Sequence, residues 1–160
     1  MLTQALSLLN LEANDTVLDL FCGLGNFSLP LAQTAKRVTG IEGDETMVKR
    51  AAENAQQNKI NNIEFHTANL FETEQPLLNN YYEKVVLDPP RAGAIEIMPH
   101  LVKMSPKMIL YISCNPATLA RDAKVLTENG YLLAKAGVMD MFPHTSHVEA
   151  IALFVKKTSK

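Results

Sequence analysis

The sequence predicts an α/β fold, with a largely parallel sheet and helices on both of its faces. Short apolar runs alternate along the 160 residues with segments of helical periodicity, and a glycine turn follows the first strand-like run. Alternation of this kind is typical of wound α/β sheets. The length suits one domain with a real core, so we expect residues 1–160 to form a single domain.

Seven apolar runs are expected to form the strands. Each is short, and polar or helix-like segments separate one from the next. The expected strands are residues 16–21, 37–42, 63–69, 84–88, 108–114, 131–139 and 147–157.

Helices are expected at the N-terminus, directly after the glycine turn and in two later segments. In 44–59, Met47, Ala51 and Ala55 recur at helical spacing. After Cys114, Asn115 is a suitable cap, Pro116 suits the first helical position, and Gly130 ends the segment. The apolar stripe predicted for this last helix is Leu119, Ala123 and Leu126.

Composition and charge restrict the class of protein. Apolar residues make up 47% and charged residues 20%, as in globular proteins, and no apolar run approaches the roughly 20 residues that span a bilayer. The N-terminus does not resemble a secretion signal, so we expect a cytoplasmic protein. Two cysteines outside any CxxC predict neither a disulfide framework nor a cysteine metal cluster. A formal charge of -2 argues against a broad surface for nucleic acid.

The glycine turn suggests a nucleoside-containing cofactor. Asp19 precedes Gly23 and Gly25 in the pattern D-x-x-x-G-x-G, and Ser28 stands where a dinucleotide fingerprint would have glycine. Glu42 ends the next strand, where it could accept hydrogen bonds from both ribose hydroxyls. Together these features favour S-adenosylmethionine over a dinucleotide; a turn with only a structural role is the alternative.

Two further strand ends carry polar residues. Asn69 could contact an adenine edge, or could simply form a turn. Asp88 is followed by two prolines and Arg91. Amino-group methyltransferases have an aromatic residue at the last of these positions, whereas Arg91 suits an anion or a carboxylate. The alternative is a turn made rigid by proline, with a solvated arginine.

Cys114 is the candidate nucleophile. It follows a strand and precedes a helix, and helix N-termini stabilise anions, so a thiolate should be favoured there. An unreactive core thiol is the alternative. Cys22, in the glycine turn, is expected only to pack.

Glu149 is the candidate general base, because it interrupts an apolar strand and partial desolvation would raise its pKa. An edge charge or an ion pair is the alternative. His144 and His147 precede it without a third metal ligand nearby, so we expect no metal site.

Four ordered motifs, "DLFCGLGNFSLPLA", "LDPPRAG", "ISCNPATLARD" and "HVEAIALF", resemble the RNA uracil-5-methyltransferases, most closely the RlmD type that acts on 23S ribosomal RNA. The resemblance implies a class I S-adenosylmethionine-dependent methyltransferase sheet, Rossmann-like, with an antiparallel last strand. It implies that Cys114 is the nucleophile and that Glu149 removes a proton. The residues that it assigns to the cofactor are Phe21, Asn26, Glu42, Asn69 and Asp88, beside the motif glycines Gly23 and Gly25.

The same resemblance implies RNA as the partner. Family members also carry an N-terminal RNA-binding barrel and an iron-sulfur segment, so we expect these 160 residues to be the catalytic domain alone, with RNA affinity residing largely in the other parts. Two alternatives remain open. One is a non-catalytic remnant that binds the cofactor, and the other is a class I methyltransferase with a different substrate.

Overall fold

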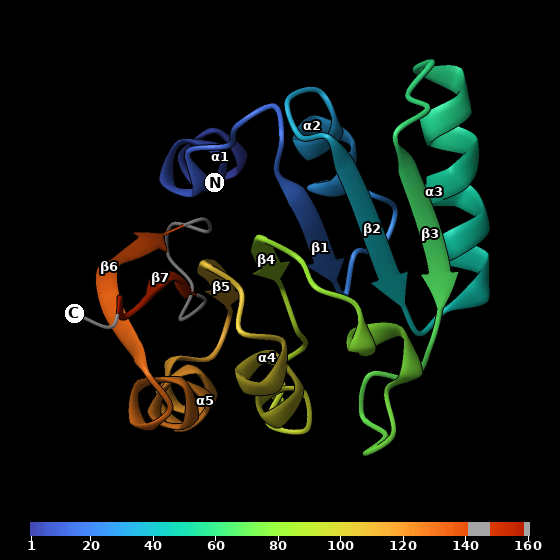
Figure 1. Ribbon diagram of the computed structural model, residues 1–160. Coiled ribbons are helices and arrows are strands. Elements are labelled where there is room, and N and C mark those ends of the chain that lie inside the picture. Colours follow the sequence, from blue (N-terminus) through green and yellow to red (C-terminus); the bar gives the residue numbers. More distant parts are fainter. Residues whose placement is uncertain (141–147, 159–160) are drawn as a thin grey trace.

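The computed structural model describes residues 1–140 and 148–158. Within them, seven strands form one sheet in the order β3-β2-β1-β4-β5-β7-β6 (Figure 1). The strands are β1 (Thr16–Leu20), β2 (Arg37–Glu42), β3 (Ile63–Thr67), β4 (Lys84–Leu87), β5 (Met108–Ser113), β6 (Tyr131–Asp140) and β7 (Val148–Lys156). Each lies within about two residues of its predicted position.

The strand directions explain how one edge of the sheet becomes a site. Strands β1 to β5 run parallel, and β7 is antiparallel to both β5 and β6. The predicted antiparallel last strand is therefore confirmed. Between β1 and β4 the strand order reverses, and crevices for ligands form outside the carboxyl ends of the strands at such a point.

Four of the helices were predicted and the other elements were not. The helices are α1 (Leu2–Leu9), α2 (Ser28–Ala32), α3 (Glu45–Gln57), α4 (Met98–Met104) and α5 (Pro116–Glu128), with a 3-10 turn η1 (Pro76–Asn79). The missed elements, α4 and η1, have seven and four residues. So few residues give little helical periodicity to detect.

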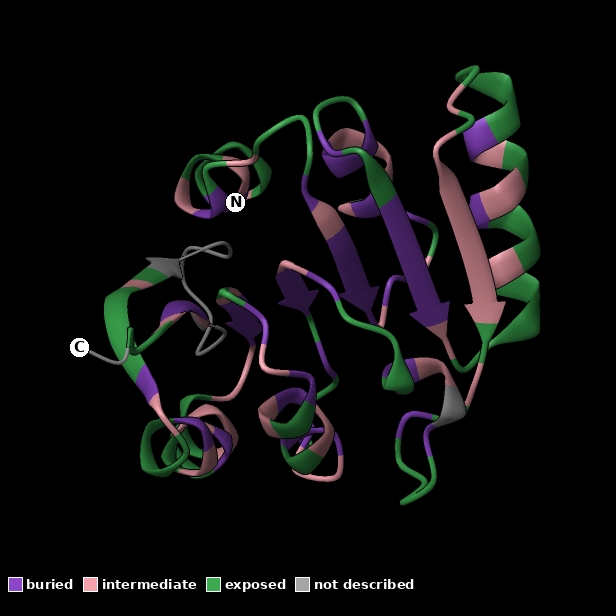
Figure 2. Ribbon diagram, in the orientation of Figure 1, coloured by how far each residue is buried: buried purple, intermediate pink, exposed green. Residues whose placement is uncertain are grey.

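Apolar side chains cover both faces of the sheet. On one face α1 and α2 pack over Val17, Val38 and Val86, and on the other α4 and α5 pack over Leu18, Leu87 and Tyr111. Figure 2 shows the buried residues concentrated in the central strands. Such double coverage explains why these strands read as continuous apolar runs.

The predicted stripe of α3 is narrower than expected. Ala51 and Ala55 are buried, whereas Met47 is 42% exposed.

Among the described residues, none of the helices is both long and apolar enough to cross a bilayer.

Candidate active site

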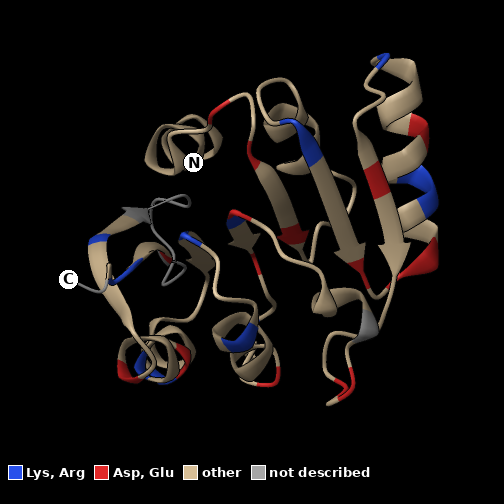
Figure 3. Cartoon of the chain, viewed as in Figure 1, with Lys and Arg blue, Asp and Glu red and all other residues tan. Residues whose placement is uncertain are grey.

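The carboxyl edge of the sheet gathers the residues that the sequence singled out. Glu42 ends β2, and Phe21, Asp88 and Cys114 directly follow β1, β4 and β5. In Figure 3 the red colour of acidic residues appears at the carboxyl ends of β1 and β2. A cationic ligand is therefore favoured at this edge.

Glu42 fixes the glycine turn. Its Oε2 accepts a hydrogen bond from the Gly23 amide at 3.1 Å, and its Oε1 accepts from the amides of Gly43 at 2.7 Å and Asp44 at 3.1 Å. The half-buried carboxylate is thus held in place at the carboxyl edge of the sheet. Since each carboxylate oxygen has two lone pairs, Oε2 retains acceptor capacity for a ligand hydroxyl.

The two glycines of the turn have different roles. A Cβ on Gly23 (φ +54) would meet nothing within 4 Å, so open space lies in front of this residue. At Gly25 (φ +86) a Cβ would collide with Leu29 and would lie 3.3 Å from Phe65. Gly25 is therefore required for packing beneath the turn, whereas Gly23 leaves room at its surface. Asn26, the next residue, is exposed.

Gly25→Ala should lower the free energy of unfolding by about 1–3 kcal/mol, because it combines overpacking with an unfavourable backbone angle. Gly23→Ala is the matched control and should cost only the backbone term, about 1 kcal/mol. Denaturant unfolding of both variants measures the difference. Equal losses would contradict the packing role of Gly25.

Asp19 is a buried acid below the glycine turn. It is 1% exposed; its Oδ2 accepts a hydrogen bond from the Ser28 hydroxyl, and its Oδ1 has no hydrogen-bond partner among the described residues. Burial, with a smaller contribution from the charge of Asp88, outweighs the Ser28 hydrogen bond and raises the pKa of Asp19 to about 7. A buried carboxylate oxygen without a partner among the described residues fits a cationic or hydrogen-bond-donating ligand.

The raised pKa of Asp19 predicts that the ligand-free fold loses stability as pH rises. The folded state binds this proton more tightly than the unfolded chain, so the stabilisation is full below the usual carboxyl pKa near 4 and is lost as pH approaches about 7. Melting temperatures at pH 5 and pH 8 test this. Asp19→Asn should reduce the difference between them, and an unchanged difference would contradict the assignment.

Phe21 and Asn69 shape the mouth of the site between β1 and β3. Phe21 has a left-handed φ of 61°, and its ring centroid lies 5.8 Å from that of Phe71. Asn69 accepts a hydrogen bond from the Phe71 amide at 3.1 Å, and its Nδ2 donates to Glu72 at 3.2 Å. Asn69 thus forms the turn that presents Phe71. The sequence analysis missed Phe71, which is 44% exposed.

Cys114 and Glu149 emerge at the same end of the sheet. In the antiparallel pairing of β5 with β7, Ser113 lies opposite Ala150. Cys114 is the next residue after Ser113 and Glu149 is the one before Ala150, so both stand at the same end of this strand pair. Both are half-buried.

Asp88 lies near this pair. The residue is exposed, but protein atoms around its carboxylate still desolvate it, and together with the negative charge of Glu149 they raise the pKa of Asp88 to about 6. The charge of Glu149 therefore acts on Asp88 across the end of β5, which lies between β4 and β7 in the sheet.

The turn that carries Cys114 is well defined. The Ser113 hydroxyl accepts from the Asn115 amide and donates to the Asn115 carbonyl, both at 3.0 Å. Asn115 Oδ1 accepts from the Ala117 amide at 3.1 Å, which confirms the predicted cap of α5. Cys22 differs, because it is 6% exposed and burial strongly raises the pKa of its thiol. The prediction that Cys22 packs is confirmed.

The remaining site predictions concern metals and histidines. No group of three or more possible metal ligands occurs among residues 1–140 and 148–158. His144 and His147 lie outside the described residues.

Comparison with known proteins shows similarity to RNA methyltransferases. The model of the tRNA (uracil-5-)-methyltransferase family matches residues 1–157. The chain is 54% identical to 23S rRNA (uracil(1939)-C(5))-methyltransferase RlmD of Legionella pneumophila and 55% identical to RlmD of Hahella chejuensis, over 98% of the chain in each case. It spans 36% of the length of these relatives.

Solved structures give the same picture. The tRNA (uracil-54, C5)-methyltransferase of Pyrococcus abyssi, solved with S-adenosyl-L-homocysteine, superimposes with a TM-score of 0.81 and 32% identity, covering 96% of this chain and 37% of the other. A precorrin-6y C5,15-methyltransferase of Geobacter metallireducens is 15% identical with a TM-score of 0.79, which shows the fold alone. The fold is that of the class I methyltransferases, as predicted.

Proposed function

The chain belongs to the tRNA (uracil-5-)-methyltransferase family, and from this premise we propose that it transfers the methyl group of S-adenosylmethionine to C5 of a uridine in RNA. The observation that carries the proposal is the register of β5 and β7: Ser113 pairs with Ala150, so Cys114, which follows the first, and Glu149, which precedes the second, leave the sheet at the same end. A nucleophile and a base at one sheet edge are the two groups that C5 methylation requires. The similarity to RlmD proteins supports 23S ribosomal RNA as the substrate.

The residues at the carboxyl edge fit the cofactor. S-adenosylmethionine supplies a methyl group activated by a positively charged sulfonium. The carboxylates of Asp19, Glu42 and Asp88 would favour that charge, and the space in front of Gly23 would admit the ligand. The cofactor contacts proposed here are those implied by the family motifs: Phe21, Gly23, Gly25, Asn26, Glu42, Asn69 and Asp88.

Cys114 would act first. Its thiolate would add to C6 of the uracil, and the electrons of the C5–C6 double bond would move toward O4 as an enolate. The enolate makes C5 nucleophilic, so C5 would take the methyl group and the sulfonium would leave as a neutral thioether. The thiol is half-buried at a turn, where the uracil ring of an RNA substrate can reach it.

Glu149 would complete the reaction. After methyl transfer, C5 carries both the new methyl group and its original hydrogen. The Glu149 carboxylate would remove that hydrogen as a proton, the C5–C6 double bond would re-form, and the Cys114 thiolate would leave. Asp88 lies close enough for the negative charge of Glu149 to contribute to its raised pKa, so a second carboxyl group stands near the proposed base.

RNA capture by this chain alone is proposed to be weak. The formal charge of -2 provides little general attraction for phosphates. We infer that segments N-terminal to the domain in the longer family members supply most of the RNA affinity, and that the protein works in the cytoplasm.

The proposal is tested by incubating the chain with S-adenosylmethionine and excess unmodified 23S RNA fragments, followed by mass spectrometry of the nucleosides. The expected product is 5-methyluridine. Cofactor binding without any methylated nucleoside would instead favour a non-catalytic remnant. A methyl group on another atom or molecule would favour a class I methyltransferase with a different substrate.

A further inference from the structure

Helix α5 is fastened to the loop that follows β4, here called the proline loop (residues 88–94). The contacts lie along one stripe of the helix at positions 115, 118, 121 and 122, a spacing that places residues on the same helical face. The proline loop begins with Asp88, and α5 begins directly after Cys114. The fastening therefore connects two segments that carry proposed active-site residues.

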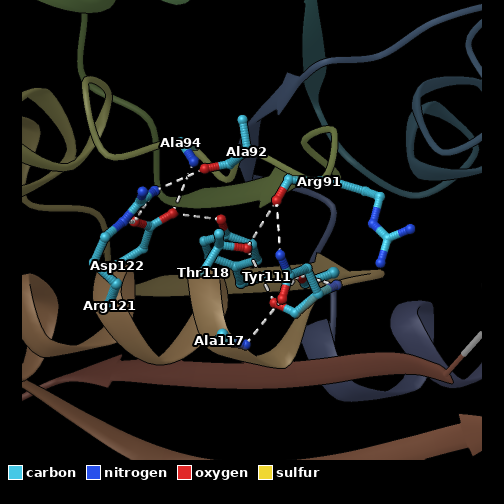
Figure 4. A network of polar contacts seen from close by, with 10 residues as sticks. Arg91, Ala92, Ala94, Tyr111, Ala117, Thr118, Arg121 and Asp122 are labelled. Atoms are coloured by element: carbon cyan, nitrogen blue, oxygen red, sulfur yellow. Dashed lines mark hydrogen bonds and ion pairs between the residues drawn. The ribbon is translucent and has the colours of Figure 1, made fainter.

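The stripe reaches three successive parts of the proline loop (Figure 4). The carbonyl oxygen of Arg91 accepts hydrogen bonds from Asn115 Nδ2 at 3.1 Å and from the Thr118 hydroxyl at 3.2 Å. One residue later, Arg121 Nη2 donates to the carbonyl oxygen of Ala92 at 2.9 Å. Together these contacts hold the loop backbone and leave the Arg91 side chain exposed.

Asp122 is the centre of the arrangement. Its side chain is fully buried. Oδ2 accepts from the Ala94 amide at 2.7 Å and from the Tyr111 hydroxyl at 2.6 Å, while Oδ1 accepts from Arg121 Nε at 2.8 Å. Burial, aided by Asp122, raises the pKa of Tyr111, so the hydroxyl stays a donor. Asp122 thus connects α5, β5 and the proline loop.

Gly93 shows how closely the two segments approach. A Cβ at this position (φ +80) would lie 2.6 Å from Arg121 Nη2 and 2.7 Å from Asp122 Oδ2. Only glycine leaves room for both side chains and adopts this backbone angle without strain. Gly93 of the loop therefore packs directly against Arg121 and Asp122 of the helix.

We propose that Asp122 is a positioning residue for methyl transfer, which acts by holding the proline loop against α5 so that Asp88 and Cys114 keep a fixed mutual geometry. The inference rests on the proposed function for its chemical meaning. The proposal can be tested without RNA, because it predicts that the environment of the Cys114 thiol depends on Asp122.

The test compares Asp122→Asn and Arg121→Gln with the wild-type chain. The asparagine can still accept from Ala94 and Tyr111 but cannot accept from Arg121. The second variant keeps the Asp122 side chain and removes the two contacts of Arg121, with the Ala92 carbonyl and with Asp122 Oδ1. Lys124→Gln is the matched control, because Lys124 is an exposed cation of the same helix whose ion pair is with Glu128 at 3.8 Å. Iodoacetamide labelling is followed at Cys114 by peptide mass spectrometry, with buried Cys22 as the internal reference.

Both test variants should label Cys114 about threefold faster or more, because loosening the turn opens a half-buried thiol. Labelling at Cys22 should stay at the wild-type rate, and Lys124→Gln should match the wild type throughout. In methyl transfer, kcat should fall about tenfold or more.

Two results would overturn the positioning role. One is Cys114 labelling at the wild-type rate in both test variants. The other is a parallel rise at Cys22, which would show general loosening of the fold. Labelling needs no RNA. A wild-type chain that never methylates RNA would therefore contradict the proposed function but not the positioning role of Asp122.

Discussion

Cys114→Ala is expected to abolish methyl transfer to RNA, lowering kcat by about 1,000-fold or more. Without the thiol no adduct forms at C6, and C5 of uracil remains too weak a nucleophile to take the methyl group. The Kd for S-adenosylmethionine should change less than about twofold, because the proposed cofactor contacts lie at the ends of β1 to β4. Methyl transfer from labelled cofactor and calorimetry measure the two quantities.

Cys22→Ala is the matched control, because it removes the other thiol of the chain from a buried position. That variant should retain turnover once allowance is made for any loss of stability. Turnover that survives Cys114→Ala would contradict the nucleophile assignment and would favour a methyltransferase with another substrate. Loss of cofactor binding together with turnover would show that Cys114 has a structural role instead.

Glu149→Gln should trap the reaction after methyl transfer. The amide cannot accept the C5 proton, so elimination of Cys114 is blocked and a methylated covalent complex accumulates with ordinary uridine RNA. Denaturing gels should show a slowly migrating labelled band, and the rate of free product formation should fall by about 100-fold or more.

Glu128→Gln is a suitable control, because Glu128 is an exposed acid at the end of α5. It should give wild-type turnover and no accumulated band. Normal product release by Glu149→Gln would contradict the base assignment. In that case Asp88, whose pKa is raised to about 6 beside Glu149, would be the next candidate.

Local patterns predicted most of the fold. The strands are apolar runs, and the cap of α5 follows from Asn115 and Pro116, so each could be recognised from neighbouring residues alone. The placement of Cys114 between a strand and a helix was predicted for the same reason. The short helix α4 was missed, because about two turns leave no clear period.

What the sequence did not reveal depends on distant partners. The stripe predicted for α5 was apolar, yet Asp122 is fully buried because its partners Ala94 and Tyr111 arrive from other segments. Glu42 was expected to meet a ribose, and its bonds to the glycine turn became visible only in the structure. Such contacts join residues 11 to 28 positions apart, which no local pattern records.

The covalent mechanism can be observed by offering the chain 23S RNA fragments that carry 5-fluorouridine, together with methyl-labelled S-adenosylmethionine. Fluorine at C5 cannot leave as a proton leaves, so elimination fails and the enzyme stays attached to the RNA. The expected result is a labelled adduct on denaturing gels with the wild type and with Cys22→Ala, and none with Cys114→Ala. An undiminished adduct in Cys114→Ala, or methylation of uridine RNA without any adduct on the fluorinated RNA, would contradict nucleophilic catalysis by Cys114.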